Sequence, residues 1–271
     1  MDSMRFEGRE LGLHCEPVVA GELEDGKVYY CVSFVDRLML IPKLQPLVFV
    51  GRGLDGDDAG RAYFQDVNSY QQGFRYDSGC KSESSDATFE KRNNSTMTDV
   101  FKYDRALDVL LRCALRRRKA TALELRGGES IGHVQPDYAP TGPMWFEARD
   151  IKPYAEPIDS NELSEGAIYF SSTFLDDADE LLTPLLFPLV FIGRNIDPED
   201  LGTEAVSNLY FQDAKSYLRG IRYGSSLRID GFDPWFEVSS ENEANHVFQY
   251  EHALDGLIRC ELQRRKHPED W

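Results

Sequence analysis

Two stretches of this chain, 147 residues apart, have nearly the same sequence. Residues 63–76 read YFQDVNSYQQGFRY and residues 210–223 read YFQDAKSYLRGIRY, with nine of fourteen positions identical. Residues 101–119 match residues 248–266 at twelve of nineteen positions, again 147 residues apart. Self-similarity at a fixed spacing is typical of a repeated structural unit. The sequence therefore predicts a tandem duplication whose two copies share one fold.

The repeats divide the 271 residues into two units and a spacer. FEGRELGLHCEP, from residue 6, pairs with FEARDIKPYAEP, from residue 146, and the second match ends near residues 119 and 266. We expect a first unit at residues 6–119, a Gly/Pro-rich spacer at 120–145 and a second unit at 146–266. Two domains also agree with the usual domain size of roughly 100–200 residues.

Each copy contains several stretches typical of β-strands. Some are rich in β-branched and aromatic side chains and follow an acidic turn, and others are short apolar runs expected of buried strands. The segments that we expect to be extended are, in the two copies, 26–34 and 166–174, 46–52 and 188–194, 63–66 and 210–213, 74–76 and 221–223, and 89–90 and 236–237.

A long helix should end each copy. Leucines recur at helical spacing over residues 106–115 and again over residues 253–262. A short helix is expected earlier in each copy, capped by Asp66 or Asp213 and ended by a glycine. Each copy is thus predicted to be an α+β unit of about 115 residues, and the two units are expected to pack as a pseudo-twofold pair.

The cysteines indicate a reducing compartment. Cys113 and Cys260 occupy the same position in the two predicted helices, where we expect buried thiols. No CxxC motif and no Cys/His spacing suited to zinc occurs, so no metal or other cofactor is predicted. The first residues lack the apolar core of a signal peptide, and no apolar run reaches the roughly 20 residues of a membrane span. We expect a cytoplasmic protein.

Charge is distributed unequally between the two copies. The chain carries a net charge of −17. Residues 6–119 hold 17 basic and 18 acidic residues, a net of −1, whereas residues 146–266 hold 11 and 23, a net of −12. Such a field repels nucleic acid and anionic membranes and attracts a basic protein surface. The candidate partner-binding residues are the clustered acids Asp176, Asp177, Asp179, Glu180, Asp197, Glu199 and Asp200.

A second candidate set consists of the polar residues that both copies share. An Asp, a Ser, a Tyr and an Arg can line a pocket for a small polar ligand, but no histidine lies near the Ser to activate a nucleophile. The alternative is a buried network in which Arg75 pairs with Asp66, and Arg222 with Asp213, to hold a strand–helix junction. The shared residues are Gln65, Asp66, Ser69, Tyr70 and Arg75, and Gln212, Asp213, Ser216, Tyr217 and Arg222.

Three functions remain open on these observations. The first is a non-enzymatic binding protein, such as an immunity or antitoxin-type inhibitor, that docks an acidic face on a basic partner. The second is a small-molecule-binding protein or enzyme that uses the repeated QD..SY..G.RY residues. The third is a structural module that self-associates. A pocket lined by the repeated residues would favour the second function, and a broad acidic face would favour the first.

Overall fold

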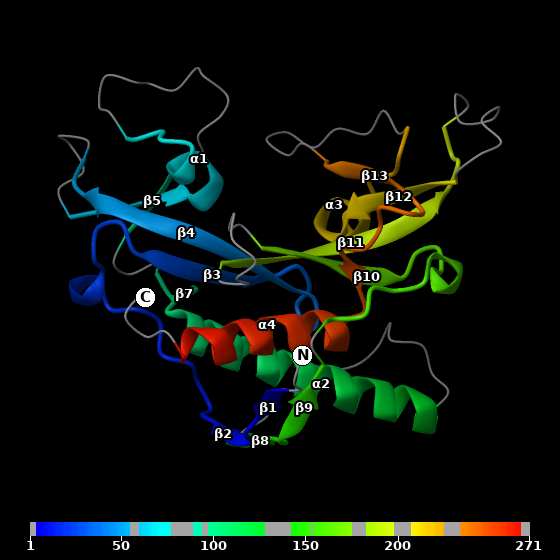
Figure 1. Ribbon diagram of the computed structural model, residues 1–271, viewed down its shortest axis with the longest axis horizontal. Helices are drawn as coiled ribbons and strands as arrows, with labels where there is room; N and C mark the ends of the chain where they lie inside the picture. The colour runs from blue at the N-terminus through cyan, green and yellow to red at the C-terminus, as the bar shows by residue number, and fades with distance from the viewer. Residues whose placement is uncertain are drawn as a thin grey trace.

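One ten-stranded antiparallel sheet runs through the molecule (Figure 1). The computed structural model describes residues 4–54, 60–76, 89–93, 97–127, 142–152, 154–174, 183–197, 207–224 and 234–266. Residues before position 128 supply the strands β3 (Val28–Phe34), β4 (Pro42–Arg52), β5 (Ala62–Asp66), β6 (Phe89–Arg92) and β7 (Val100–Phe101). Residues after position 141 supply β10 (Ile168–Phe174), β11 (Pro184–Arg194), β12 (Asn208–Asp213), β13 (Phe236–Ser240) and β14 (Val247–Phe248).

The two halves of the sheet have their strands in the same order. In the first half β4 lies between β3 and β5, with β6 and β7 at the edges, and β11, β10, β12, β13 and β14 repeat this order. Even a register shift in β4, between Phe49 and Gly51, recurs in β11 between Phe191 and Gly193. The half-sheets join where β4 pairs with β11. We call residues counterparts where they occupy the same place in the two halves.

Two long helices, α2 (Tyr103–Gly127) and α4 (Tyr250–Arg264), cover one face of the sheet (Figure 1). They include the segments predicted to be helical. The other face carries the short helices α1 (Val67–Gln71) and α3 (Ala214–Leu218), and 3-10 turns lie at Ala20–Glu22 and Ser160–Glu162. The predicted α+β class is therefore confirmed.

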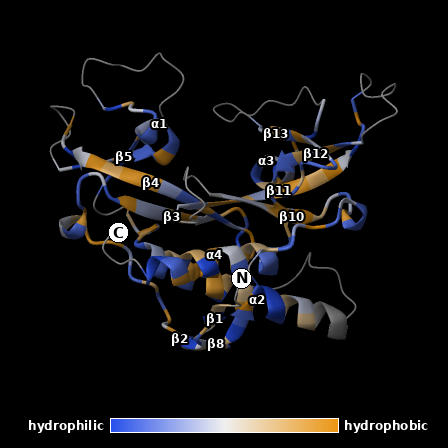
Figure 2. Cartoon of the chain, viewed as in Figure 1, coloured by the Kyte–Doolittle hydropathy of each residue, from blue (hydrophilic) through white to orange (hydrophobic). Residues whose placement is uncertain are grey.

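The main core lies between the long helices and the sheet, where Figure 2 shows apolar residues on the faces that meet. Its buried side chains come from both halves. The Tyr103 hydroxyl donates to the Leu257 carbonyl oxygen at 2.8 Å, and the Tyr250 hydroxyl donates to the Leu110 carbonyl oxygen at the same distance. Cys113 and Cys260 are fully buried, as predicted. The helices are thus joined by two reciprocal hydrogen bonds.

Four short strands, which the sequence reading missed, form a further layer under the helices. They are β1 (Met4–Phe6), β2 (Arg9–Leu11), β8 (Met144–Phe146) and β9 (Arg149–Ile151). β1 pairs with β9 and β2 pairs with β8, so each pair takes one strand from each half. Phe6 and Phe146 are buried and meet edge to face, with ring centroids 6.0 Å apart. The halves therefore share both a sheet and a second set of strand pairs.

The helix α2 continues past residue 120, where the spacer was expected to begin, to Gly127, because residues 120–126 are mostly strong helix formers before two glycines. One strand prediction in each half was wrong. The segments 74–76 and 221–223 were expected to be strands, but neither is one. Gly73 has a φ of 89° and turns the chain, and the Phe74 N–H then donates to the Ser69 carbonyl oxygen, which closes α1 instead of extending the sheet.

Candidate functional site

The polar residues shared by the two halves organise the junction between β5 and α1. Asp66 caps α1, since its Oδ1 accepts from the Ser69 N–H at 2.9 Å and its Oδ2 accepts from the Ser69 hydroxyl at 2.5 Å. The buried Gln65 amide donates from Nε2 to Ser69 Oγ at 2.8 Å and to the Phe74 carbonyl oxygen at 3.0 Å. One amide therefore ties the strand, the helix and the following turn together.

The second half repeats this arrangement between β12 and α3. Gln212 Nε2 donates to Ser216 Oγ at 2.6 Å and to the Ile221 carbonyl oxygen at 3.0 Å. Asp213 accepts from the Ser216 N–H at 2.8 Å and from the Ser216 hydroxyl at 2.6 Å. Gln212 and Ser216 are fully buried. These side chains bond to one another and to the following turn, so they are parts of the scaffold at this junction, although Oε1 of Gln65 and of Gln212 is buried without a hydrogen-bond partner among the described residues.

The predicted pairing of Arg75 with Asp66, and of Arg222 with Asp213, is wrong. The Arg75 guanidinium lies 3.9 Å from the Tyr70 ring centroid and donates to the carbonyl oxygens of Tyr70 and Phe74 at 2.7 and 2.8 Å. Each capping aspartate already accepts from its Ser, and the glycine turn carries the arginine outward onto the tyrosine face. Arg222 stacks on Tyr217 in the same way, also at 3.9 Å.

In the second half, the stacked arginine and tyrosine line a cavity of about 590 Å³. Its wall includes Glu165, Tyr217, Arg222 and Tyr223. The Tyr223 hydroxyl donates to Asp197 Oδ2 at 3.1 Å, which places one of the predicted partner-binding acids beside this cavity. The other six lie outside the described residues: Asp176, Asp177, Asp179, Glu180, Glu199 and Asp200.

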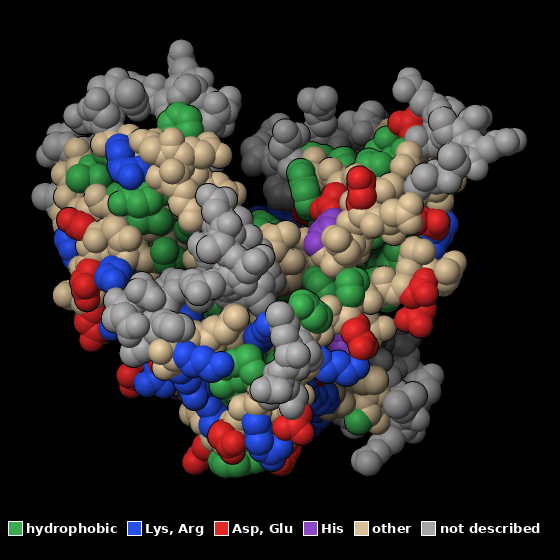
Figure 3. Space-filling view, in the orientation of Figure 1, with side chains coloured by type: hydrophobic (Ala, Val, Ile, Leu, Met, Phe, Trp, Pro, Cys, Tyr) green, Lys and Arg blue, Asp and Glu red, His purple; other side chains and the backbone are tan. Residues whose placement is uncertain are grey.

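The described surface locates part of the charge difference between the halves. Figure 3 shows acidic side chains along the outer edge of the second half, at the right, and mixed acidic and basic ones on the first half. Glu162, Glu165 and Glu243 are exposed at that end, and Arg194 there is neutralised by Glu241. Three basic residues of the first half, Lys27, Arg61 and Lys91, have the neutral counterparts Ala167, Asn208 and Val238.

The two halves also differ in the residue just before β7 or β14, which contacts a side chain of β6 or β13. In the first half, Arg92 donates to Asp99 at 2.8 Å and to Glu90 at 2.7 Å. In the second half His246 replaces Asp99, and its Nε2 contacts the Glu237 carboxylate while Nδ1 lies 3.3 Å from the Glu243 carbonyl oxygen. The hydrogen bond with Glu237 raises the pKa of His246, against the opposing effect of burial.

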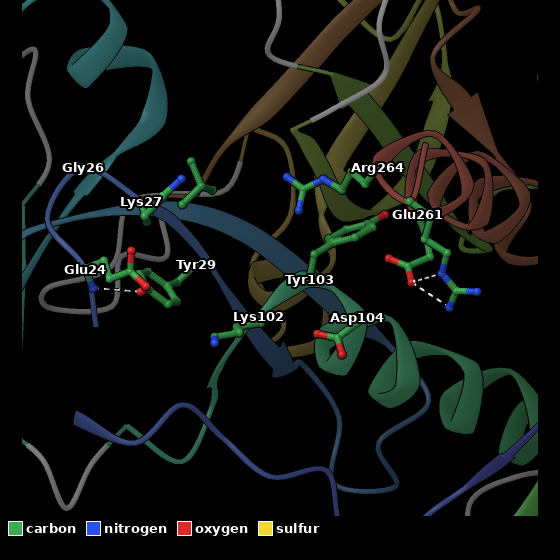
Figure 4. Close-up of a pocket in the computed structure, with 11 residues that line it drawn as sticks. Glu24, Gly26, Lys27, Tyr29, Lys102, Tyr103, Asp104, Glu261 and Arg264 are labelled. Carbon is green, nitrogen blue, oxygen red and sulfur yellow. Dashed lines mark hydrogen bonds and ion pairs between the residues drawn. The ribbon is translucent and has the colours of Figure 1, made fainter. Parts of the chain in front are cut away.

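A site that the sequence reading missed lies between the start of α2, the start of β3 and the end of α4 (Figure 4). It is a cavity of about 490 Å³, within the size range of small-molecule sites. The residues that give it its charge are Glu24, Lys27, Lys102, Asp104, Glu261, Arg264 and Arg265.

The wall of this cavity is ordered by an arginine that rests on aromatic rings. The Arg264 guanidinium lies 4.5 Å from the Tyr103 ring centroid and 5.2 Å from that of Tyr30, and donates to the Tyr30 hydroxyl at 2.7 Å. Beside it the buried Glu261 accepts from Arg265 at 2.9 Å. In Figure 4, Lys27 and Arg264 reach toward the open space from opposite sides, and Lys102 lies below it.

The signal in the sequence that could have revealed this cavity is a difference in charged residues between matching positions of the two halves. Some charged residues of the cavity are not shared between the halves. Lys27 and Lys102 have the neutral counterparts Ala167 and Gln249 in the second half, and Glu261 has the counterpart Ala114 in the first half. Such positions lie inside otherwise matching elements, so a difference there changes the surface while the fold is kept.

The described residues contain no group of His, Cys, Asp and Glu side chains placed to hold a metal ion. Among those same residues, every helix is too short or too polar to cross a membrane. No family model, no curated protein and no solved structure matches the chain. Its function is therefore inferred from its own residues.

Proposed function

We propose that this chain is a non-enzymatic, cytoplasmic protein-binding module that docks the acidic surface of its second half on a basic partner protein. The observation that supports this proposal is the difference in charge between two halves of the same strand order, −1 against −12. At three positions a basic side chain of the first half has a neutral counterpart in the second half. Acidic side chains are exposed at other positions of the second half.

An acidic surface of this kind suits an inhibitor of the immunity or antitoxin type, which covers the basic active surface of a toxin. Opposite charges on two partners speed their encounter and disfavour wrong partners, while contacts at the centre of the interface set how long the complex lasts. The proposal therefore predicts association that slows as salt rises.

We further infer that the chain arose by tandem duplication and that a pseudo-twofold axis relates its halves. The sequence matches, the common strand order, the repeated register shift and the reciprocal tyrosine hydrogen bonds support this origin. After a duplication, one half can change its surface charge while both keep the residues that hold the fold.

The test compares matched neutralising variants of the two halves. The partner is isolated by cross-linking in the source cells, purified, and its association rate with the full chain is measured at low and high salt. The first variant combines Glu162→Gln, Glu165→Gln and Glu243→Gln, all exposed on the second half. The control combines Glu16→Gln, Glu22→Gln and Asp25→Asn, all exposed on the first half.

We expect the second-half variant to associate roughly tenfold more slowly at low salt, with little change in dissociation, because peripheral charges act mainly on encounter. The control should associate at nearly the original rate. A partner that binds both variants equally fast, or whose association is independent of salt, would show that the acidity serves only solubility.

A second candidate function, binding of a small polar molecule through the repeated residues, is favoured by the cavity beside Tyr217 and Arg222. Both side chains reach this cavity without belonging to the buried junction network. A ligand whose binding is lost in Arg222→Ala at an unchanged melting temperature would favour this function over protein docking.

A further inference from the structure

In one of two counterpart sites an ion pair joins the two long helices, and in the other, which is a cavity of about 490 Å³, the corresponding pair is absent. At the start of α4, Arg118 of α2 donates to Glu251 in two hydrogen bonds of 2.8 and 2.7 Å. Burial acts to raise the pKa of Glu251, but hydrogen bonds from Arg118 and Arg149 outweigh it and lower that pKa below its usual value. The pair thus joins α2 to the start of α4.

At the start of α2, the corresponding arginine binds a different carboxylate. The counterparts of Arg118 and Glu251 are Arg265 and Asp104. Arg265 binds Glu261 on its own helix instead, and the ion-pair contact of Asp104 is with Arg105 at 3.8 Å. Glu261 replaces an alanine of the other half, so a single added carboxylate holds the arginine that would otherwise pair with Asp104.

The cavity is lined by more basic side chains than its counterpart. Lys27 and Lys102 face it, where the second half has Ala167 and Gln249. Neither lysine makes an ion pair within the described part of the chain, and Arg264 is fixed beside them on Tyr30 and Tyr103. Lysines that are not paired with a carboxylate can bind a phosphate as point charges.

The remaining lining sets what else the ligand must carry. The first turn of α2 lines the cavity, and the dipole of a helix start favours an anion there. Val28 and the Tyr103 ring give the wall an apolar part, and the carboxylates of Glu24 and Asp104 accept hydrogen bonds. An inorganic ion would leave these groups unused, whereas a phosphate ester bearing hydroxyl or amino groups would engage them.

We propose that this cavity binds a small organic phosphate, with the phosphate between Lys27, Lys102 and Arg264 and its hydroxyl or amino groups on Glu24 and Asp104. This site lies mainly on the first half and does not depend on the docking proposed for the second half.

The test uses calorimetric titration of the full-length protein at low ionic strength. The probes are glucose 6-phosphate and O-phosphoserine, with glucose, serine and inorganic phosphate as controls. We expect at least one of the two esters to bind more tightly than inorganic phosphate, and glucose and serine not to bind. Failure of both esters to bind at millimolar concentration, or equal binding of inorganic phosphate, would overturn the proposal.

Two variants take their substitutions from the other half of the molecule. Lys27→Ala with Lys102→Gln should weaken ester binding roughly 10–100-fold, since two charge-assisted contacts are lost. Glu261→Ala should free Arg265 to pair with Asp104 and weaken binding about tenfold while leaving both lysines in place. A control that removes two exposed charges elsewhere, Lys152→Ala with Arg37→Gln, should bind normally.

Melting temperatures of all variants establish that they are folded. Ester binding that survives in both pocket variants as well as in the control would place the ligand elsewhere and would overturn this assignment. Since these substitutions avoid Glu162, Glu165 and Glu243, a failure here leaves the test of the proposed docking unaffected.

Discussion

At the scale of single residues, the polar side chains that the two halves share divide into two groups. Asp66, Ser69 and Gln65 are linked to one another at a strand–helix junction, whereas Arg75 lies outside on a tyrosine face. A residue that both halves share is therefore not necessarily part of the buried network, because the same motif also contains an exposed arginine–tyrosine stack.

This division predicts different costs of substitution. Asp66→Ala removes the cap of α1 and the acceptor of the Ser69 hydroxyl, so the free energy of unfolding should fall by about 1–2 kcal/mol. Arg75→Ala removes an exposed side chain and should cost less than about 0.5 kcal/mol. Urea unfolding of both variants measures the difference. A larger fall in the free energy of unfolding for Arg75→Ala than for Asp66→Ala would show that the arginine is part of the scaffold.

At the scale of elements, the long strands and helices could be predicted because each carries its own pattern. The eleven-residue strands β4 and β11 contain the predicted apolar runs, and α2 and α4 show leucines at helical spacing. The three-residue strands β1, β2, β8 and β9 are too short to show a period. Their pairing depends on partners about 140 residues away, which no local pattern reveals.

The candidate site could be predicted only in part for a related reason. The QD..SY motif indicated a junction, and the capping role of Asp66 and Asp213 followed from local sequence. The Figure 4 cavity combines β3, the start of α2 and the end of α4, so residues 24–29, 102–104 and 261–265 meet only once the fold is formed. The direction of Arg265 likewise depends on a neighbour on its own helix, Glu261.

The contact between β13 and the turn before β14 should make the second half sensitive to pH. His246 pairs with Glu237, and this hydrogen bond raises the pKa of His246. A raised pKa in the folded state means stabilisation that is complete below about pH 6.5, the usual value for an unfolded histidine, and is lost as pH rises through the folded pKa. In the counterpart contact, burial acts to lower the pKa of Arg92, but hydrogen bonds with Glu90 and Asp99 outweigh it and raise that pKa further above this range, so the arginine keeps its charge.

The measurement is the free energy of unfolding of the original protein and of His246→Gln between about pH 6 and pH 8.5. The destabilisation caused by the substitution should be larger at the acidic end and shrink toward the alkaline end. Arg92→Gln, in the first half, should cost the same at both ends of the range. A difference for His246→Gln that stays constant or grows with pH contradicts the assigned pair.

At the scale of the whole molecule, neither half completes its own structure. Leu186 of β11 faces Leu44 of β4, α4 packs on α2, and each short strand pair takes one strand from each half. The two halves therefore share one core, because the largest apolar cluster among the described residues takes side chains from both. A half produced alone would expose this cluster and leave β8 and β9 without partners.

The reciprocity of these contacts gives the last prediction. β8 is the counterpart of β1 and β9 of β2, so two copies of residues 142–271 can supply each other with the missing strand pairs and helix contact. We expect this fragment to be largely unfolded when dilute and to gain secondary structure together with dimer mass as concentration rises, because folding and association are then one equilibrium. Circular dichroism and light scattering over the same concentration series would measure both.

Leu186→Ala should shift the transition to higher concentration, while the exposed Trp235→Ala should not. A fragment that is fully folded as a monomer would mean that the halves are independent domains and that the shared core adds little to either.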